Sequence, residues 1–124
     1  MCESENGVCN SHDCPIPVGC CDVITISGAN HWALNQVYVR SSASPSPDNI
    51  VYIGVDNVHA VWLGQKTGTT RVTRVGQRYD MPHGAGYIQG QIVGDCPTGG
   101  TTDWWEVNYY GQWNINHNIK IACS

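Results

Sequence analysis

The cysteines are the residues whose type and spacing point most directly to chemistry. Seven cysteines occur in 124 residues, and five of them lie within the first 21 positions. Such density in a short chain is typical of disulfide-stabilised proteins in oxidising compartments. The odd count permits at most three intrachain bridges and leaves one thiol for another copy or another protein. The candidate disulfide cysteines are Cys2, Cys9, Cys14, Cys20, Cys21, Cys96 and Cys123.

Metal binding is the alternative chemistry for the cysteine-rich segment. Cys9, His12 and Cys14 lie close together, with Cys20 and Cys21 downstream. Zinc sites favour ligand pairs spaced as C-x2-C or H-x3-H, and this spacing matches neither. Adjacent cysteines fit a disulfide framework better, so we expect no metal and no cofactor. The turn aspartates lack EF-hand spacing and are expected to be solvated: Asp48, Asp56, Asp80, Asp95 and Asp103.

The aromatic residues near the C-terminus are the best candidates for binding. Alternation along a strand places Trp105, Val107 and Tyr109 on one face, which we expect in the core. The other face would leave Trp104 and Tyr110 near the surface beside Glu106 and Asn108. Exposed aromatic rings beside hydrogen-bonding groups suit sugar faces or protein interfaces. The candidate ligand or interface residues are Trp104, Tyr110 and Trp113; the alternative is that the opposite sheet or the N-terminal arm covers them.

No catalytic residues are expected. Glu106 and Asp103 could in principle form a glycosidase pair, but three positions apart on one strand they project to opposite faces. His83 and Cys96 could be imagined as a base and a nucleophile, but Cys96 is expected to be oxidised. The sequence therefore indicates a protein that is not an enzyme.

The elements that must position these residues are short strands. Valine and isoleucine dominate the apolar residues, and leucine occurs only at positions 34 and 63, which favours strands over amphipathic helices. Asp56-Asn57 reads as a hairpin turn. The predicted strands are Val23–Ser27, Gln36–Arg40, Ile50–Val55, Val58–Leu63, Thr70–Val75, Tyr87–Val93, Asp103–Tyr109 and Ile115–Ile121, with Ile115, Ile119 and Ile121 on one face. Short strands separated by Gly- and Pro-containing turns predict a small all-β sandwich or barrel of about seven or eight strands.

Composition limits the possible partners. The formal net charge is −4, only 13% of residues are charged, and the six cations form no basic patch, so nucleic acid is not an expected partner. No apolar run is long enough to span a membrane. The first residues are polar and acidic rather than a signal peptide, so a secreted chain would be a mature form or a fragment.

The pattern from Cys21 to Cys123 resembles an extracellular β-module that recurs in large secreted and cell-surface proteins of marine invertebrates and protists. The resemblance rests on a strand ending in Ser-Gly, an Asn-x-x-Tyr element, a Val-Tyr strand, an aromatic strand, a small-residue stretch, Cys-Pro, a Trp-rich strand and a final Ile/Val strand. Here these are Ile24–Gly28, Asn35–Arg40, Val51-Tyr52, Ala60–Leu63, Gly84–Tyr87, Cys96-Pro97, Thr102–Val107 with Gln112-Trp113, and Asn118–Cys123.

The chain departs from this pattern at two places. It has Asn35-Gln36 where the pattern has Asn-Gly, and Val72–Gly76 where the pattern has Trp-x-Ile/Val-Gly. The resemblance implies an extracellular, non-catalytic module and supplies no ligand. A weaker likeness, through Val37–Ser41 and Trp105–Val107, is to bacterial SH3-type domains, although the spacing is longer here.

The later cysteines can be paired in more than one way. Cys21 opens the first predicted strand and Cys123 ends the last. The first and last strands of small β-domains often lie side by side, so Cys21–Cys123 or Cys20–Cys123 is expected. Cys96–Cys123 competes, because both residues belong to the closing segment of the module. A bridge across so long a loop would contribute about 4 kcal/mol in the entropic description.

The sequence thus predicts a secreted, disulfide-stapled, all-β domain over residues 21–124, preceded by an irregular Cys-rich arm over residues 1–20. Its expected function is structural or adhesive, with assembly through self-association or contacts with other extracellular proteins, in which the arm would take part. The alternatives are a glycan-binding module and a small secreted toxin or inhibitor.

Overall fold

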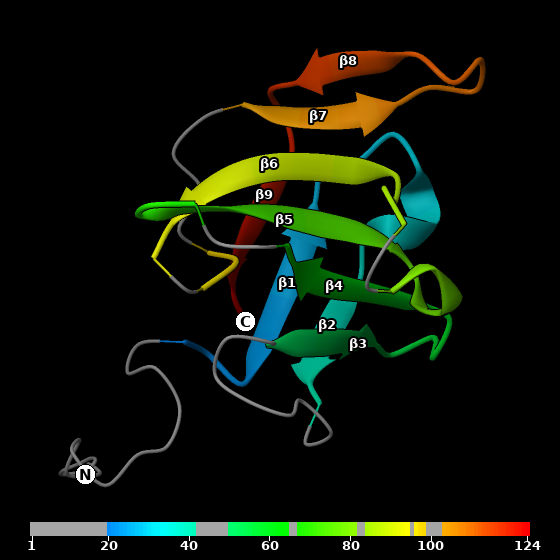
Figure 1. Cartoon of the computed structure of the whole chain (residues 1–124). Helices are drawn as coiled ribbons and strands as arrows, with labels where there is room; N and C mark the ends of the chain where they lie inside the picture. Colours follow the sequence, from blue (N-terminus) through cyan, green and yellow to red (C-terminus); the bar gives the residue numbers. More distant parts are fainter. Residues whose placement is uncertain (1–19, 42–49, 65–66, 82–83, 95, 99–102) are drawn as a thin grey trace, which may run out of the picture.

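The computed structural model describes residues 20–41, 50–64, 67–81, 84–94, 96–98 and 103–124 (Figure 1). In these ranges, nine strands form one antiparallel sheet, and the helical elements are two single 3-10 turns, η2 (Trp32–Leu34) and η4 (Arg78–Asp80). The prediction of an all-β fold is confirmed. The strands are β1 (Val23–Ser27), β2 (Val37–Arg40), β3 (Val51–Gly54), β4 (His59–Leu63), β5 (Thr70–Gln77), β6 (Ile88–Val93), β7 (Trp104–Val107), β8 (Trp113–Asn116) and β9 (Lys120–Cys123). No helix in this part of the chain has the length and apolar character needed to cross a membrane.

The order of the strands makes the sheet curl. It reads β8-β7-β6-β5-β4-β3-β2-β1-β9, so β1 to β8 form a meander and β9 returns to pair with β1. β8 and β9 lie at opposite ends of this order, although only residues 117–119 separate them in the chain. The two ends can approach only if the sheet bends round, and Figure 1 shows β1 and β9 passing behind β4 and β5.

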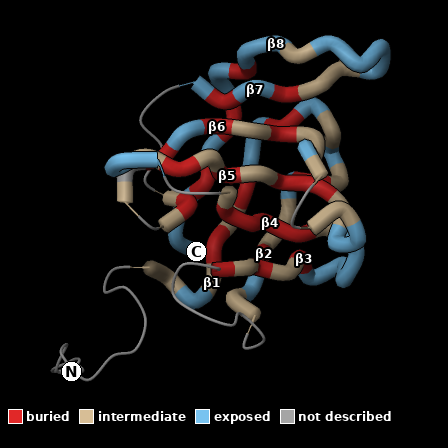
Figure 2. Tube along the Cα trace, in the orientation of Figure 1, coloured by how far each residue is buried: buried red, intermediate tan, exposed pale blue. Residues whose placement is uncertain are grey.

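The core fills the inner face of the curled sheet, where buried positions alternate along the strands (Figure 2). Tyr52, Val61, Val75 and Ile88 occupy opposed positions on four successive strands, and all four are fully buried. β-branched and aromatic side chains pack well on such a pleated surface. Each fully buried side chain of this size contributes about 1.5–3 kcal/mol relative to an exposed one.

The predicted strands coincide with β1 to β7 to within two residues at each end. The last predicted strand, Ile115–Ile121, is wrong, because a turn at positions 117–118 divides it between β8 and β9. The Asn118 N–H donates to the Asn116 side-chain oxygen at 2.9 Å, a local bond that competes with strand extension. Ile115 consequently faces outward and is 40% exposed, whereas Ile119 and Ile121 are buried.

Two disulfides tie the start of the domain to its later cysteines: Cys20–Cys96 and Cys21–Cys123. The Cys21–Cys123 bridge joins the approach to β1 with the end of its partner strand β9, as predicted. The pairings Cys20–Cys123 and Cys96–Cys123 are wrong, because Cys96, which follows β6, is bonded to Cys20. No cysteine in the described ranges is free. Cys2, Cys9 and Cys14, the arm before Cys20 and the predicted unpaired thiol lie outside the described residues.

Trp104 is buried inside the sheet, which corrects the expectation that it lies near the surface. Its side chain is only 8% exposed. Its ring lies against Gly90 on the neighbouring strand β6, where a Cβ atom would overlap the ring carbons. The ring therefore requires a residue without a side chain at position 90.

Gly90→Ala should lower the free energy of unfolding by about 1–3 kcal/mol, because the added methyl group displaces the Trp104 ring. Urea titration followed by tryptophan fluorescence, with the disulfides intact, measures this loss. Gly64→Ala is the matched control, since a Cβ there meets its nearest neighbour at an ordinary 3.5 Å. Equal midpoints for the two variants would contradict the packing described.

Candidate functional site

The hairpin formed by β7 and β8 presents two faces of opposite character. Register places Trp105 opposite Ile115 and Val107 opposite Trp113, and these four side chains form an outer apolar face. The inner face carries Glu106 opposite Asn114, and Trp104 opposite Asn116. The prediction that Trp105, Val107 and Tyr109 fill the core is wrong. Pairing of Glu106 with the fully buried Ile88 of β6 turns the carboxylate inward instead.

Glu106 is buried and connects the hairpin to the far end of the sheet. One carboxylate oxygen accepts the Asn30 N–H at 3.0 Å and the Asn116 side-chain N–H at 2.9 Å. The other accepts the His31 N–H at 2.9 Å. The Asn116 amide also donates to the Gly28 carbonyl at 3.0 Å. Charge-assisted bonds of this kind offset the cost of burying a carboxylate.

These bonds hold one side of the 28–36 loop, the segment between β1 and β2. The His31 Nε2 atom lies 2.7 Å from the Val107 carbonyl, and its ring stacks on Tyr87 with centroids 5.1 Å apart. Inside the loop, the Asn35 side chain bonds both the N–H and the carbonyl of Ala29, at 2.8 and 2.9 Å. The loop is therefore fixed by several independent contacts.

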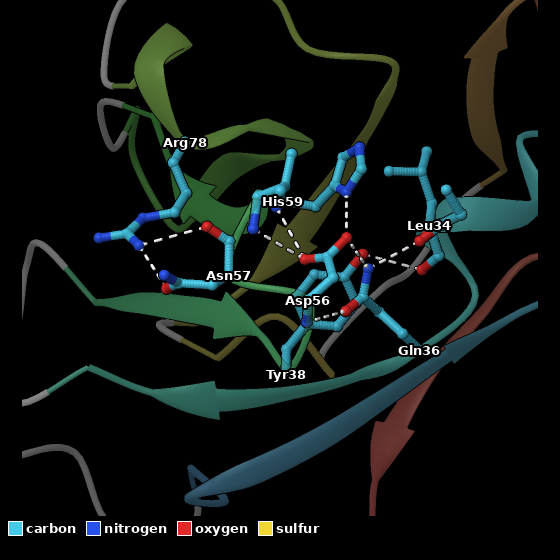
Figure 3. Close-up of polar contacts among 9 residues, drawn as sticks. Leu34, Gln36, Tyr38, Asp56, Asn57, His59 and Arg78 are labelled. Atoms are coloured by element: carbon cyan, nitrogen blue, oxygen red, sulfur yellow. Dashed lines mark hydrogen bonds and ion pairs between the residues drawn. The ribbon is translucent and has the colours of Figure 1, made fainter.

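A second network holds the other side of the 28–36 loop (Figure 3). The Gln36 side-chain N–H groups bond the Ala33 carbonyl at 2.7 Å and the Asp56 carboxylate at 2.9 Å. The Tyr38 hydroxyl donates to the Leu34 carbonyl at 2.8 Å, and burial raises the pKa of this phenol. The loop is thus tied to the turn between β3 and β4.

Asp56 organises that turn and was expected to be solvated. Its carboxylate accepts the N–H groups of Val58 and His59 at 2.9 and 3.1 Å, and it lies 2.6 Å from the His59 Nδ1 atom. Partial burial acts to raise the pKa of Asp56. The hydrogen bonds from the Gln36 and His59 side chains and from the backbone outweigh this effect and hold the pKa well below its usual range. Asn57, which follows with φ 62°, completes the predicted turn.

The fixed 28–36 loop presents a large aromatic side chain to solvent. Trp32 is 83% exposed although the loop that carries it is constrained at both ends. In the turn of the β7–β8 hairpin, Tyr109 and Tyr110 are also exposed and meet edge to face, with centroids 5.8 Å apart. An exposed aromatic residue on a fixed backbone has only its side-chain conformational entropy to lose on binding.

A cleft of about 300 Å³ lies between the β7–β8 hairpin and the start of the 28–36 loop. We call it the amide cleft, because asparagines from both walls line it. Its size is at the lower end of the range for small-ligand sites. The lining includes Asn30, His31, Glu106, Asn108, Tyr109 and Asn114.

The three predicted binding residues differ in how far their side chains are exposed. Trp104 is buried, Tyr110 is exposed in the hairpin turn, and Trp113 is half-buried on the outer apolar face. Sequence reasoning missed Trp32 and Asn30. A hydrophobic-pattern search could not find them, because they lie in a polar loop whose conformation depends on Glu106, distant in sequence.

The residues weighed for catalysis or metal binding are not brought together in the described ranges. Asp103 is exposed and lies 3.1 Å from His117, away from the inward Glu106. Cys96 is oxidised, and His83, Asp48 and Asp95 lie outside the described residues. In the described ranges, no group of three or more His, Cys, Asp or Glu side chains is arranged to hold a metal ion.

No protein-family model, curated protein or solved structure matches this chain. Any inference about function therefore rests on the geometry of the residues themselves.

Glu106→Gln should lower the free energy of unfolding by about 2–3 kcal/mol, because one acceptor becomes an NH₂ group facing N–H donors. Chemical denaturation measures the change. Asp103→Asn is the control: it neutralises an exposed carboxylate and should alter stability by less than about 0.5 kcal/mol. If the Glu106→Gln variant unfolds at the same denaturant concentration as the wild type, the carboxylate does not stabilise the fold as described.

Asp56→Asn should lower the free energy of unfolding by about 1 kcal/mol at neutral pH. The pKa of Asp56 is lower in the folded than in the unfolded chain, so its contribution is complete above the unfolded value of about 4 and declines as pH falls below it. The stabilities of wild type and variant should converge between about pH 5 and pH 2. Urea titrations across this pH range measure the two free energies of unfolding, with Asp22→Asn as a control that removes an exposed carboxylate. A difference in stability between wild type and Asp56→Asn that does not change with pH would contradict the prediction.

Proposed function

We propose that this chain is an extracellular structural or adhesive module that assembles through contacts between copies, and that strand β8 makes the contact. Two disulfides in a domain of this size are compatible with an oxidising, extracellular setting. The observation that carries the proposal is the open edge of β8 beside the outer apolar face.

The hydrogen-bond pattern of the hairpin defines that edge. In an antiparallel pair, hydrogen-bonded and non-hydrogen-bonded positions alternate. The Asn108 N–H donates to the Gln112 carbonyl at 2.7 Å, and the Val107 N–H points the other way, to Tyr87 on the β6 side. Alternation from these bonds directs the N–H and C=O groups of Trp113 and Ile115 away from β7. β8 ends the sheet order, so no further strand of the described chain pairs with them.

The chemistry of β8 does not protect this edge. Natural edge strands often carry lysine, proline or a bulge that prevents pairing with another chain. β8 reads Trp-Asn-Ile-Asn, without charge or proline, whereas the opposite edge strand β9 carries Lys120. The outer apolar face adjoins this edge, with Trp105 44% and Ile115 40% exposed. Apolar patches of this kind mark interaction sites.

A second copy is the occupant that fits this edge. Two identical strands can pair antiparallel about a two-fold axis, so each copy presents and receives the same groups. The pairing would place the outer apolar faces of the two hairpins side by side, since alternation keeps Trp113 and Ile115 on one side of the strand. The combined sheet would bury apolar surface from both copies.

Ile115→Lys should convert an associating chain into a monomer, because the lysine places like charges opposite each other across the two-fold axis. Sedimentation equilibrium of the full chain, with free thiols alkylated, measures the association. Val39→Lys is the matched control: Val39 is 46% exposed on β2, a strand paired on both sides, and this variant should associate as the wild type does. Circular dichroism verifies that both variants fold.

Two outcomes would overturn the proposal. One is a wild-type chain that stays monomeric up to about 1 mM. The other is equal association of the Ile115→Lys and Val39→Lys variants, which would move the contact to another part of the chain, such as the arm before Cys20.

A further inference from the structure

The amide cleft carries an inference that does not depend on self-association. We propose that it is a binding site for a neutral saccharide, with Asn30 and Asn114 as the hydrogen-bonding groups and Tyr109 as the aromatic surface. Some polar groups of the cleft are already hydrogen-bonded within the protein, and others remain available to a ligand.

Several polar groups of the cleft already make hydrogen bonds within the fold. Both oxygens of Glu106 accept hydrogen bonds from the opposite wall and from Asn116. The Asn108 side-chain oxygen accepts the N–H groups of Tyr110 and Gln112, at 2.8 and 2.9 Å, and its amide donates to the Gln112 side chain at 3.2 Å. These groups fix the shape of the cleft.

Two side-chain amides of the cleft are available to a ligand. The amides of Asn30 and Asn114 make no hydrogen bond to the described part of the chain, and both residues are exposed. Asn30 belongs to the fixed 28–36 loop and Asn114 to strand β8, so the two amides come from opposite walls. Each amide offers a donor and an acceptor side by side, which matches neighbouring hydroxyl groups on a sugar ring.

The charge of the cleft selects a neutral ligand. Among the described residues that line the cleft, Glu106 is the one acidic side chain, both of its oxygens accept hydrogen bonds, and no lysine or arginine occurs. The His31 Nε2 atom is engaged with the Val107 carbonyl. An anion such as a phosphate would therefore find no lysine or arginine, and a cation would find a carboxylate already hydrogen-bonded to the protein. A polyhydroxylated, uncharged molecule satisfies the amides without an uncompensated charge.

An aromatic residue supplies the remaining contact. Tyr109 lines the cleft and is 95% exposed. Aromatic rings pack against the C–H face of a sugar while the ring edges remain hydrated. Because His31 is hydrogen-bonded to Val107 and stacked on Tyr87, the wall of the cleft that His31 forms is already fixed before binding.

Titration of the ¹⁵N-labelled full chain with maltose, lactose, cellobiose and N,N′-diacetylchitobiose tests the proposal by NMR. At least one disaccharide should shift the side-chain NH₂ signals of Asn30 and Asn114 with a dissociation constant near about 1 mM, and should leave that of Gln91, on the outer face, in place. A sulfated heparin disaccharide should produce no such shift, because the described lining of the cleft contains no lysine or arginine to pair with a sulfate.

Asn114→Ala and Tyr109→Ala should each weaken binding by about fivefold or more. The matched controls remove an exposed amide and an exposed tyrosine elsewhere: Gln91→Ala and Tyr79→Ala should bind as the wild type does. Absence of any shift up to about 10 mM sugar, or equal affinity of cleft and control variants, would overturn the proposal. Sugar binding by the wild-type chain, diluted until sedimentation shows only monomers, would separate this site from the assembly contact.

Discussion

The fold depends on one buried carboxylate that closes a sheet whose edges do not pair. β8 and β9 are joined by residues 117–119, yet the ladder stops at β8 on one side and at β9 on the other. Within the described residues, backbone hydrogen bonds between strands therefore do not close the curled sheet. Glu106 takes their place, since its oxygens receive the Asn30 and His31 N–H groups from the loop after β1 and the Asn116 amide from β8. A carboxylate with three N–H donors is stable in this position, but the loss of any partner would leave a buried charge or buried donors unsatisfied.

The same closure determines what the protein can present to a partner. The 28–36 loop lies between Glu106 on one side and the Gln36 and Asp56 network on the other, so Trp32 is exposed on a fixed backbone. The disulfides act elsewhere: Cys21–Cys123 joins the start of β1 to the end of β9, whereas the loop follows the other end of β1. Crosslinks and carboxylate thus stabilise opposite ends of the same strand pair. The end of the β1–β9 pair that lies near the β7–β8 hairpin therefore carries no disulfide in the described residues, and hydrogen bonds determine its conformation.

Much of the fold follows from local sequence, and the site does not. The alternation in Val23–Ser27 and the Asp56-Asn57 turn were sufficient to place strands and a hairpin, because period-two burial and turn chemistry act over a few residues. The face assignment of β7 failed because both faces carry a tryptophan, and apolar content alone favoured burying Trp105 over Glu106. Burial of Glu106 requires donors at Asn30 and His31, about 75 positions away, which no local pattern contains. The apolar spacing of Ile115, Ile119 and Ile121 concealed a turn that depends on a single asparagine side chain.

Strand β8 has two contrasting sides because the meander ends there. Its inner side contributes Asn114 to the amide cleft, and its outer side contributes Ile115 both to the apolar face and to the lining of the cleft. In a central strand, both neighbours would compete for these groups and for the backbone between them. With only 13% charged residues, the chain supplies amides, aromatic rings and strand backbone as its means of contact, rather than ion pairs. Contacts of these kinds are little weakened by salt, since screening acts on charges. The proposed contacts are therefore expected to persist in media of high ionic strength, where exposed ion pairs contribute least.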